Sequence, residues 1–567
     1  MQKGIGGSAG YGVGRVVIIS NSKPEYVVKT VTDTEAEVKR YEAAAETFEK
    51  RTQEMAEAMR DRVGDHNAEI LEGHILLLRD PGMEEIVKST IRNGTCAEAA
   101  FESACDMFSQ MFQMTGDEML KQRVTDINDI RMRMLKILTG TPDCNIAEVP
   151  AGTILVAEDL TPSMTAGIVK ENVAGILTAV GGKTSHSAIL ARALQIPAVL
   201  GISGIVSMVH DGMEVAIDGC DGECILEPTE QEKTAYLMKR ADYLKQLSML
   251  QIYKGKETLT GDGRKVQLFA NIGSTEDAGQ VLACDGEGIG LFRTEFLFMG
   301  ASELPTEEEQ FQAYKKVAEL MQGKSVIIRT LDVGGDKDIP YLKMEKEENP
   351  FLGFRAVRYC LFHEEVYRVQ LRALLRASAF GDIKIMVPLV TSVEEMRAVK
   401  SLLHKLMEEL DCEGRKYNKN IRVGAMIETP AACLIADLLA KEADFFSIGT
   451  NDLTQYTMAV DRGNAKVSYL YSVYHPAVLR AIRHIIQTGK EAGIPVGMCG
   501  EAAADPLLIP LLISFGLDEY SVSATSILAT RGTIAKWTVS EADKLAEEAL
   551  LLSTEKEVEE LLRKRSV

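Results

Sequence analysis

The sequence has few features of a secreted or membrane-bound protein. Its ten cysteines are scattered over 567 residues, which is typical of free thiols in a reducing compartment rather than of a disulfide framework. No stretch approaches the roughly 20 uninterrupted apolar residues that span a bilayer. Residues 1–20 also lack the charged-then-apolar pattern of a signal peptide. We therefore expect a cytoplasmic protein without membrane insertion.

Positive charge is also scarce. Lysine and arginine total 63 against 83 aspartates and glutamates, a net charge of -20. Such a balance disfavours nucleic acid and anionic membranes as partners. Hydrophobic residues make up 46% and charged residues 26% of the chain, which excludes fibrous and largely disordered classes. Because single cores usually hold about 100 to 200 residues, the length predicts three domains.

The first part of the chain has a β-type pattern that is interrupted and then resumes. The run GVGRVVIIS predicts a strand over Gly12–Ser20, but helical periodicity follows for more than a hundred residues. The strand pattern returns with TILVA at Thr153–Ala157. A stretch without turn residues then predicts one connecting helix. We predict an α/β domain of residues 1–20 and 143–228, an inserted α-helical bundle over 21–142, and a linker helix over 229–254.

The remainder of the chain, residues 255–567, repeats one pattern. Eight β-type runs are each followed by a helical pattern, which predicts a (β/α)8 barrel. A doubly wound open sheet is the alternative. The β-type runs are residues 266–272, 288–292, 325–330, 383–389, 422–428, 444–449, 494–500 and 518–522.

Polar side chains stand where these strands end, which is where the active sites of such barrels lie. Guanidinium groups bind phosphate bidentately, and Mg²⁺ is held by one or two carboxylates together with substrate oxygens. The combination indicates an anionic phosphorylated substrate held with a divalent metal. Structural ion pairs at the barrel rim are the alternative for any single residue. The residues at strand ends are Arg293, Glu295, Arg329, Asp332, Glu428, Asn451, Asp452 and Cys499.

Four further basic residues are candidates for the same site. Arg355 and Arg358 lie in GFRAVR, Arg462 follows the sixth strand's loop, and Lys337 lies in GGDKD. Each of them fits a solvated surface position equally well. Cys499, between Gly497 and Gly500, is either a small buried residue or, because of its place at a strand end, a reactive thiol.

A second candidate site is the loop GGKTSH, residues 181–186, which separates a strand from a helical pattern. His186 is therefore expected in the first turn of a helix, where free amides and the positive end of the dipole favour a phosphoryl anion. Thr184 or Ser185 can cap that helix. The same dipole disfavours imidazolium, which leaves a neutral ring nitrogen for attack on phosphorus. The other seven histidines have no such surroundings.

At this point a resemblance adds to the residue-level interpretation. The chain closely resembles enzyme I of the bacterial phosphoenolpyruvate-dependent sugar phosphotransferase system over essentially its whole length. The helical insert, with LEGHILLLRDP, resembles that family's domain for binding the phosphocarrier protein HPr. The motifs that carry the resemblance are GGKTSHSAILAR, IPAVLG, LFRTEFLFM, RTLDVGGDK, NPFLGFRAVR, IETPAA, IGTNDLTQY and GMCGEAA, in this order.

The resemblance implies a role for each candidate residue. His186 corresponds to the phosphorylated histidine and Cys499 to the proton donor to the enolate, while Glu428 and Asp452 correspond to Mg²⁺ ligands. It also implies a homodimer formed through the barrel. Arg293, Arg329, Asn451 and Arg462 match positions that bind phosphoenolpyruvate, and Arg355, Arg358, Lys337 and Asp452 belong to motifs that line the same site.

The expected reaction moves a phosphoryl group from phosphoenolpyruvate to His186 and then to a histidine of HPr, with release of pyruvate. A rival is an enzyme like phosphoenolpyruvate synthase or pyruvate phosphate dikinase, but these need an ATP-binding domain, and the residues before the histidine domain have a helical pattern without a glycine-rich nucleotide loop. A non-catalytic sensor of phosphoenolpyruvate is a second rival. The joint presence of His186, Glu428, Asp452 and Cys499 argues against it.

Overall fold

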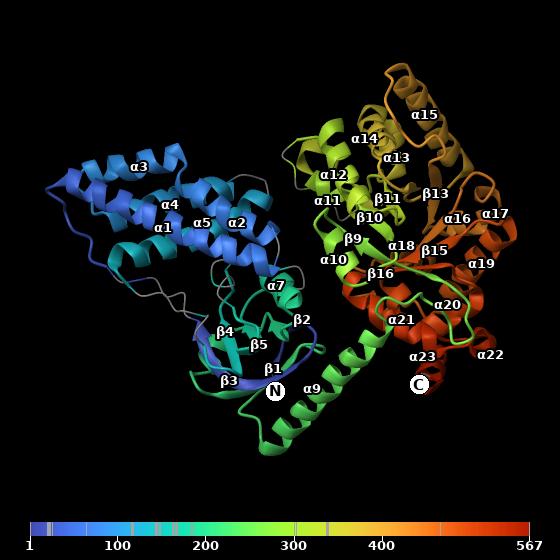
Figure 1. Cartoon of the computed structure of the whole chain (residues 1–567), viewed down its shortest axis with the longest axis horizontal. Coiled ribbons are helices and arrows are strands. Elements are labelled where there is room, and N and C mark those ends of the chain that lie inside the picture. Colours follow the sequence, from blue (N-terminus) through green and yellow to red (C-terminus); the bar gives the residue numbers. More distant parts are fainter. Residues whose placement is uncertain are drawn as a thin grey trace. The chain divides into compact units, whose positions relative to one another are not determined.

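The computed structural model divides into two compact units, residues 1–248 and 249–567, which are described one at a time (Figure 1). The structure describes residues 2–19, 24, 26–63, 65–114, 118–141, 146, 149–161, 164, 168–182, 185–299, 301, 303–335, 339–464 and 466–565.

The first unit is built on one eight-stranded sheet with the order β1-β8-β7-β3-β4-β5-β6-β2. Its centre, from β3 to β6, is parallel, and the flanking pairs are antiparallel. The predicted strand at Thr153–Ala157 is present with the same bounds. The strands are β1 Gln2–Lys3, β2 Ile5–Ser8, β3 Tyr11–Ile19, β4 Thr153–Ala157, β5 Val173–Thr178, β6 Ala198–Leu200, β7 Glu214–Asp218 and β8 Glu223–Leu226.

Helices cover this sheet because each of its faces is apolar. Leu190 and Ala191 of α7 pack in one buried cluster, and Ile205 of α8 packs in another. The helices are α7 His186–Leu194 and α8 Ile205–Met208.

Among the described residues between β3 and β4 lie five long helices, as the change of periodicity predicted. Tyr41, Phe48 and Thr52 are buried along one face of the first helix. Ala56 and Leu71 instead join the apolar cluster beneath the sheet, so the helices and the sheet share part of their core. The helices are α1 Thr34–Val63, α2 Asp65–Leu78, α3 Pro81–Arg92, α4 Ala97–Met114 and α5 Glu118–Thr139.

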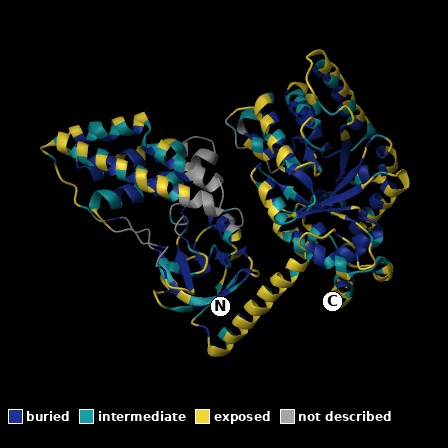
Figure 2. Ribbon diagram, viewed as in Figure 1, coloured by how far each residue is buried: buried dark blue, intermediate teal, exposed yellow. Residues whose placement is uncertain are grey.

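One further helix, α9 (Glu230–Leu250), follows the sheet and leads into a short 3-10 turn, η2 (Gln251–Tyr253). Tyr236 is its buried residue, and nearly all of the helix is drawn as exposed in Figure 2. With so little tertiary packing, the helix depends mainly on its own backbone hydrogen bonds.

The second unit is a closed barrel of eight parallel strands in the order β10-β11-β12-β13-β14-β15-β16-β9. This confirms the predicted (β/α)8 barrel and shows that the open-sheet alternative was wrong. Each strand falls on one of the eight predicted runs, and the bounds differ by at most two residues. The strands are β9 Gln267–Ile272, β10 Ile289–Arg293, β11 Val326–Arg329, β12 Ile383–Val387, β13 Arg422–Ile427, β14 Phe446–Gly449, β15 Val496–Cys499 and β16 Glu519–Ser523.

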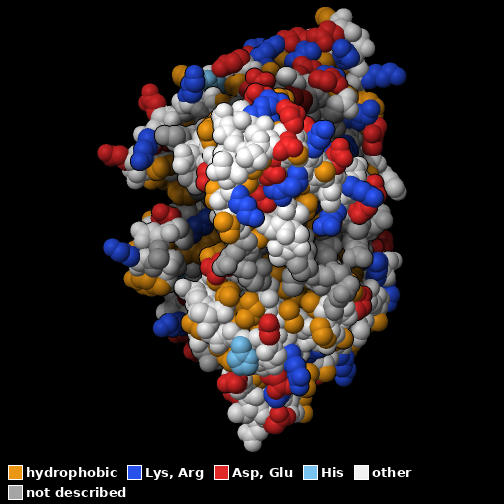
Figure 3. Space-filling view, turned by 90° about the vertical axis from the view of Figure 1, so that its left-hand side faces the viewer, with side chains coloured by type: hydrophobic (Ala, Val, Ile, Leu, Met, Phe, Trp, Pro, Cys, Tyr) orange, Lys and Arg blue, Asp and Glu red, His pale blue; other side chains and the backbone are white. Residues whose placement is uncertain are grey.

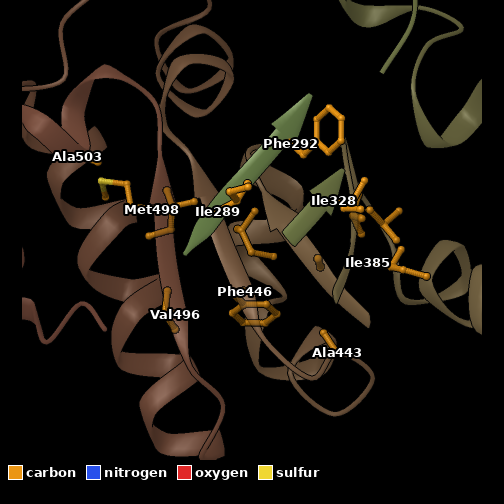
Figure 4. Close-up of a cluster of buried hydrophobic side chains, with 14 of the residues drawn as sticks. Ile289, Phe292, Ile328, Ile385, Ala443, Phe446, Val496, Met498 and Ala503 are labelled. Carbon is orange, nitrogen blue, oxygen red and sulfur yellow. The ribbon is translucent and has the colours of Figure 1, made fainter. Parts of the chain in front are cut away.

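Successive side chains of these strands alternate between the inside of the barrel and its surrounding helices. Ile328, Ile385 and Met498 belong to the large cluster between strands and helices (Figure 4). The inner side chains form a separate small cluster that includes Leu291 and Met386. The barrel interior is therefore a packed core and not a pore.

Helices surround the barrel. In neither unit do the described residues include a helix long and apolar enough to cross a membrane. Acidic and basic side chains are interspersed on the face of the molecule drawn in Figure 3. The helices are α10 Asp277–Ala283, α11 Glu295–Met299, α12 Glu307–Leu320, α13 Val357–Phe362, α14 Glu364–Ala377, α15 Val393–Cys412, α16 Pro430–Leu434, α17 Ala436–Leu439, α18 Thr450–Met458, α19 Pro476–Ala492, α20 Ile509–Phe515, α21 Ile527–Lys536, α22 Val539–Leu551 and α23 Glu555–Arg565.

Candidate active site

The carboxyl ends of β10 and β11 carry an ion-pair network. Arg329 is the last residue of β11, and its guanidinium lies 2.5 Å from Glu295 and 3.1 Å from Asp332. All three side chains are nearly fully buried. Burial alone would lower the pKa of Arg329, but the two carboxylates outweigh it and raise the pKa. Arg329 is therefore held as a cation inside the protein.

Arg355 continues this network toward the sixth strand. Its guanidinium lies 2.9 Å from Asp332 and 3.3 Å from Asp452, and its second terminal nitrogen donates to the hydroxyl of Tyr456 at 3.3 Å. Asp452 stands in the first turn of α18, directly after β14. The strand ends predicted from sequence are thus joined by short contacts.

Glu428 directly follows β13 and is 3% exposed. Its Oε1 accepts a hydrogen bond of 2.6 Å from the backbone of Leu389, a residue that has a left-handed φ of 52°. Burial and the repulsion by Asp452 and Asp332 raise the pKa of Glu428 to about 8, although Arg329 works in the opposite direction. Two buried carboxylates in such proximity favour a bound cation.

Cys499 is the last residue of β15, and its thiol lies 3.7 Å from the carbonyl oxygen of Ile448. Burial raises the pKa of Cys499 to about 11, and Arg329 and Arg293 oppose the shift. The side chain is therefore a protonated thiol at neutral pH, with cationic groups near enough to influence it.

Arg293, Asn451 and Arg462 are less buried than the network at the centre. Arg293 ends β10 in register with Arg329. The Arg462 guanidinium lies 3.8 Å from Asp452, and the backbone carbonyl of Asn451 accepts from the hydroxyl of Tyr471 at 3.3 Å. These residues stand around the same strand ends.

One of the predicted basic residues, Arg358, is not brought into this network. Arg358 donates to the carbonyl oxygens of Leu352 and Gly353 at 3.0 and 3.1 Å, so in this conformation it binds the adjoining backbone. Lys337 lies outside the described residues.

The central cations have unused hydrogen-bonding capacity. Among the described residues, the buried Nε atoms of Arg329 and Arg355 have no hydrogen-bond partner. A buried donor without a partner costs roughly 1–3 kcal/mol. An anionic ligand with several acceptor oxygens would satisfy both groups.

The same place suits a divalent cation with oxygen ligands. Glu428 and Asp452 are its two carboxylate candidates, and a Cβ at Gly449 would come within 2.4 Å of Glu428 Oε2, so glycine leaves room for that carboxylate. The described residues include no cluster of three or more metal-binding side chains. Two carboxylates are nevertheless a sufficient protein contribution for Mg²⁺, which commonly completes its shell with substrate oxygens and water.

The predicted histidine loop lies in the first unit. Helix α7 begins at His186, as expected, and Ser185 is its N-cap, accepting from the backbone of Ala188 at 3.3 Å. The hydroxyl of Ser187 donates to Asp159 at 2.8 Å. The side chain of His186, like residues 183–184, lies outside what the structure describes. The helix start thus supplies the free amides and dipole end expected beside the histidine.

Comparisons with known proteins agree with this arrangement. Family models match residues 248–539 as the PEP-binding domain, 149–222 as the mobile domain and 3–123 as the N-terminal domain of PEP-utilising enzymes. A phosphoenolpyruvate-protein phosphotransferase of Priestia megaterium is 45% identical over 562 residues, covering 99% of this chain and 98% of the relative. Its counterpart in Bacillus subtilis is 45% identical over 557 residues, covering 98% of each chain. The chain belongs to the phosphoenolpyruvate-protein phosphotransferase family.

Membership of the phosphoenolpyruvate-protein phosphotransferase family confirms the resemblance inferred from the motifs, and with it that the protein is an enzyme. It also agrees with the observed barrel and α/β fold.

The sequence analysis did not single out Tyr456, and it placed Glu295 and Asp332 at strand ends without giving either a role of its own. All three contact the buried guanidinium groups. Their signal in the sequence was their position inside the motifs LFRTEFLFM, RTLDVGGDK and IGTNDLTQY.

Proposed function

We propose that this member of the phosphotransferase family transfers the phosphoryl group of phosphoenolpyruvate to its own His186 and then to a histidine of the carrier protein HPr, as the first step of sugar uptake by the phosphotransferase system. The observation that best supports this proposal is the pair of buried, incompletely bonded guanidinium groups of Arg329 and Arg355 beside Glu428 and Asp452.

The arginines bind and orient phosphoenolpyruvate. Arg329 and Arg355 sit deepest, with Arg293, Arg462 and Asn451 around them. Their charge offsets the negative charge of the phosphoryl group and of the departing enolate in a site shielded from water. Arg358 and Lys337 are proposed to reach the same substrate. Glu428 and Asp452 would hold Mg²⁺, which when bound neutralises charge on phosphoryl oxygens.

His186 attacks phosphorus in line with the breaking bond to the enol oxygen. A nitrogen–phosphorus bond forms, the oxygen–phosphorus bond breaks, and its electron pair stays on the enolate. The start of α7 favours this step in two ways. Its free amides and dipole stabilise the phosphoryl anion, and the dipole disfavours imidazolium, so that the ring nitrogen stays neutral.

Cys499 completes the reaction by giving its proton to the methylene carbon of the enolate. The products are pyruvate and a thiolate, which solvent then reprotonates. Because its pKa is raised to about 11, the thiol carries the needed proton across the physiological range.

The parts of the chain divide this work in the proposal. Residues 1–20 and 143–228 carry the acceptor histidine, the helices of 21–142 bind HPr, and 229–254 connect them to the barrel of 255–567. The barrel binds phosphoenolpyruvate and pairs with a second copy. We further propose that the homodimer works in the cytoplasm, where phosphoenolpyruvate is available.

Labelled phosphoenolpyruvate tests the proposal directly. The protein should gain acid-labile label in the presence of Mg²⁺ and pass it to HPr, and ATP should not replace phosphoenolpyruvate. His186→Ala should remain unlabelled while it still binds phosphoenolpyruvate. His210→Ala is the matched control, because His210 is exposed and its ring lies against the backbone carbonyl of the adjacent Asp211. Label on the His186→Ala protein would disprove the assignment.

A further inference from the structure

The opposite end of the barrel contains a polar cavity that the proposed reaction does not use. Its volume is about 400 Å³, and residues at the start of the barrel strands line it. They include Lys384 of β12, Arg422 of β13 and Glu519 of β16. This volume lies within the range of small-molecule sites.

The alternation of the strands directs these side chains inward. Ile383 and Ile385 belong to the outer cluster, as does Tyr520, so Lys384 and Glu519 have the opposite orientation. Strands β12 and β16 are four positions apart around an eight-stranded closed barrel. The two charged residues therefore face one another across the interior.

An apolar layer separates this cavity from the candidate active site. Phe269, Ile327 and Phe445 line the cavity and belong to the same inner cluster as Met426 and Cys499. Cys499 is at the other end of this cluster, at the end of β15. The cavity is thus distinct from the proposed phosphoenolpyruvate site.

The position of Glu519 is unfavourable in free energy if nothing occupies the cavity, because a buried carboxyl oxygen then lacks a hydrogen-bond partner. It is 7% exposed, and its Oε1, like the nearby Oγ of Ser325, is buried without a hydrogen-bond partner among the described residues. The carboxyl lies over glycines, because a Cβ would come within 2.4 Å of Oε1 at Gly290 and 3.1 Å of Cδ at Gly497. These glycines keep space open beside the carboxyl.

The opposite wall has positive charge. Lys384 and Arg422 are partners in register on β12 and β13, and Asp382, just before β12, also lines the cavity and partly offsets them. No ion pair within 4.0 Å joins Lys384 to Glu519 in the described chain. Burial raises the pKa of Glu519 and lowers that of Lys384, as expected for two charges held apart in a partly dry space.

We propose that this cavity binds a small zwitterion of the α-amino acid class, with its ammonium group at Glu519 and Ser325 and its carboxylate at Lys384 and Arg422. A zwitterion matches the separated charges and supplies both the donors that Glu519 lacks and an acceptor for the cations. The ligand would enter from the end of the barrel opposite to the site of phosphoryl transfer.

The test uses the full chain and the twenty common amino acids, each at about 10 mM, because a ligand that binds only the folded state raises its melting temperature. At least one amino acid should raise the melting temperature, and titration calorimetry then gives the Kd of that amino acid. Two analogues of that amino acid, one lacking the carboxylate and one lacking the ammonium group, should each bind at least about tenfold more weakly than the amino acid itself. Excess phosphoenolpyruvate should not displace the ligand.

Two variants on opposite walls check the location. Lys384→Met and Glu519→Gln should each weaken binding at least about tenfold, while phosphorylation by phosphoenolpyruvate persists. Lys419→Met and Asp411→Asn are matched controls. Each makes the same kind of change in an exposed ion pair of the same unit, in which Lys419 Nζ lies 3.1 Å from Asp411 Oδ2. If Glu519→Gln fails to fold, Lys384→Met alone decides. The proposal is wrong if no amino acid binds, which would leave only water in the cavity, or if binding survives in the folded variants.

Discussion

Replacing Cys499 by alanine tests the chemistry of the proposed site most directly. The thiol is 4% exposed, and burial raises its pKa to about 11. At pH 7 the thiolate fraction is therefore about 10⁻⁴. In the forward direction the protonated form donates. In the reverse direction the rare thiolate must remove a methyl proton from pyruvate.

Two consequences follow for the exchange of pyruvate's methyl protons with heavy water in the presence of Mg²⁺. Since acid–base groups typically contribute about 10²- to 10⁴-fold, Cys499→Ala should slow exchange at least about 100-fold. In the parent protein the rate should rise about tenfold per pH unit from pH 7 toward 10, because the thiolate fraction rises in that proportion. The variant should lose this slope.

The assay is proton NMR of the pyruvate methyl signal over time. Cys433→Ala is the matched control, since Cys433 is also a buried barrel cysteine but contacts the carbonyl of Ala481 instead of lying at a strand end. Removal of one buried sulfur should cost only about 1 kcal/mol of stability, so both variants should fold. Exchange in Cys499→Ala equal to that of the parent would show that Cys499 is merely a packing residue.

Three further predictions concern the two ends of the barrel. Glu428→Gln or Asp452→Asn should slow labelling of the protein by phosphoenolpyruvate about 10²-fold or more, whereas Asp411→Asn should not. Arg355→Lys should weaken phosphoenolpyruvate binding about tenfold in a titration, because an ammonium cannot bridge several acceptors as guanidinium does; unchanged affinity would refute this. Burial raises the pKa of Glu519 from 4.5 to about 7, so the folded protein holds the proton of this carboxyl more tightly than the unfolded chain does. The stability that comes from this proton is complete below pH 4.5 and is lost as the pH rises through 7. Between pH 4.5 and 7, the free energy of unfolding measured with urea should therefore fall by about 3 kcal/mol less in Glu519→Gln than in the parent protein. An equal fall in both proteins would contradict that pKa.

The barrel could be predicted from sequence because two signals coincide in every repeat. Short apolar runs with helical patterns between them are a local property, and each run became a strand. The rule that active sites lie at the carboxyl ends of strands then brought Arg329 and Glu428 together before any contact was known. Both side chains are buried and belong to one electrostatic cluster.

Arg355 and Arg358 show where such reasoning stops. They are three residues apart in GFRAVR, a spacing that would place them on one face of a helix. Ala356 between them has a φ of 52°, and α13 begins only at Val357. The backbone turns at Ala356, so Arg355 joins the carboxylates while Arg358 binds backbone carbonyls. No periodicity in the sequence records that turn.

Other features depend on pairing between distant segments. The edge strands β1 and β2 are short and include the glycines of IGGS, so they have almost no strand signal of their own. They exist because they pair with β8 and β6, about 200 residues further along the chain. The opposition of Lys384 and Glu519 likewise arises only when the barrel closes.

The linker helix α9 has its two ends anchored to different units, and this determines where the chain can bend. Tyr236 near its start and Tyr243 past its middle pack edge-on against Tyr11 of β3. At its end, Leu250 and Tyr253 lie against Gly532 of α21. Residues 244–249 between these anchors are all exposed, so bending there would break backbone hydrogen bonds but no buried side-chain contact. A fraying turn of helix costs little compared with loss of a core. We therefore propose that the chain bends at 244–249 when the phosphoryl group passes from the barrel to His186 and onward to HPr.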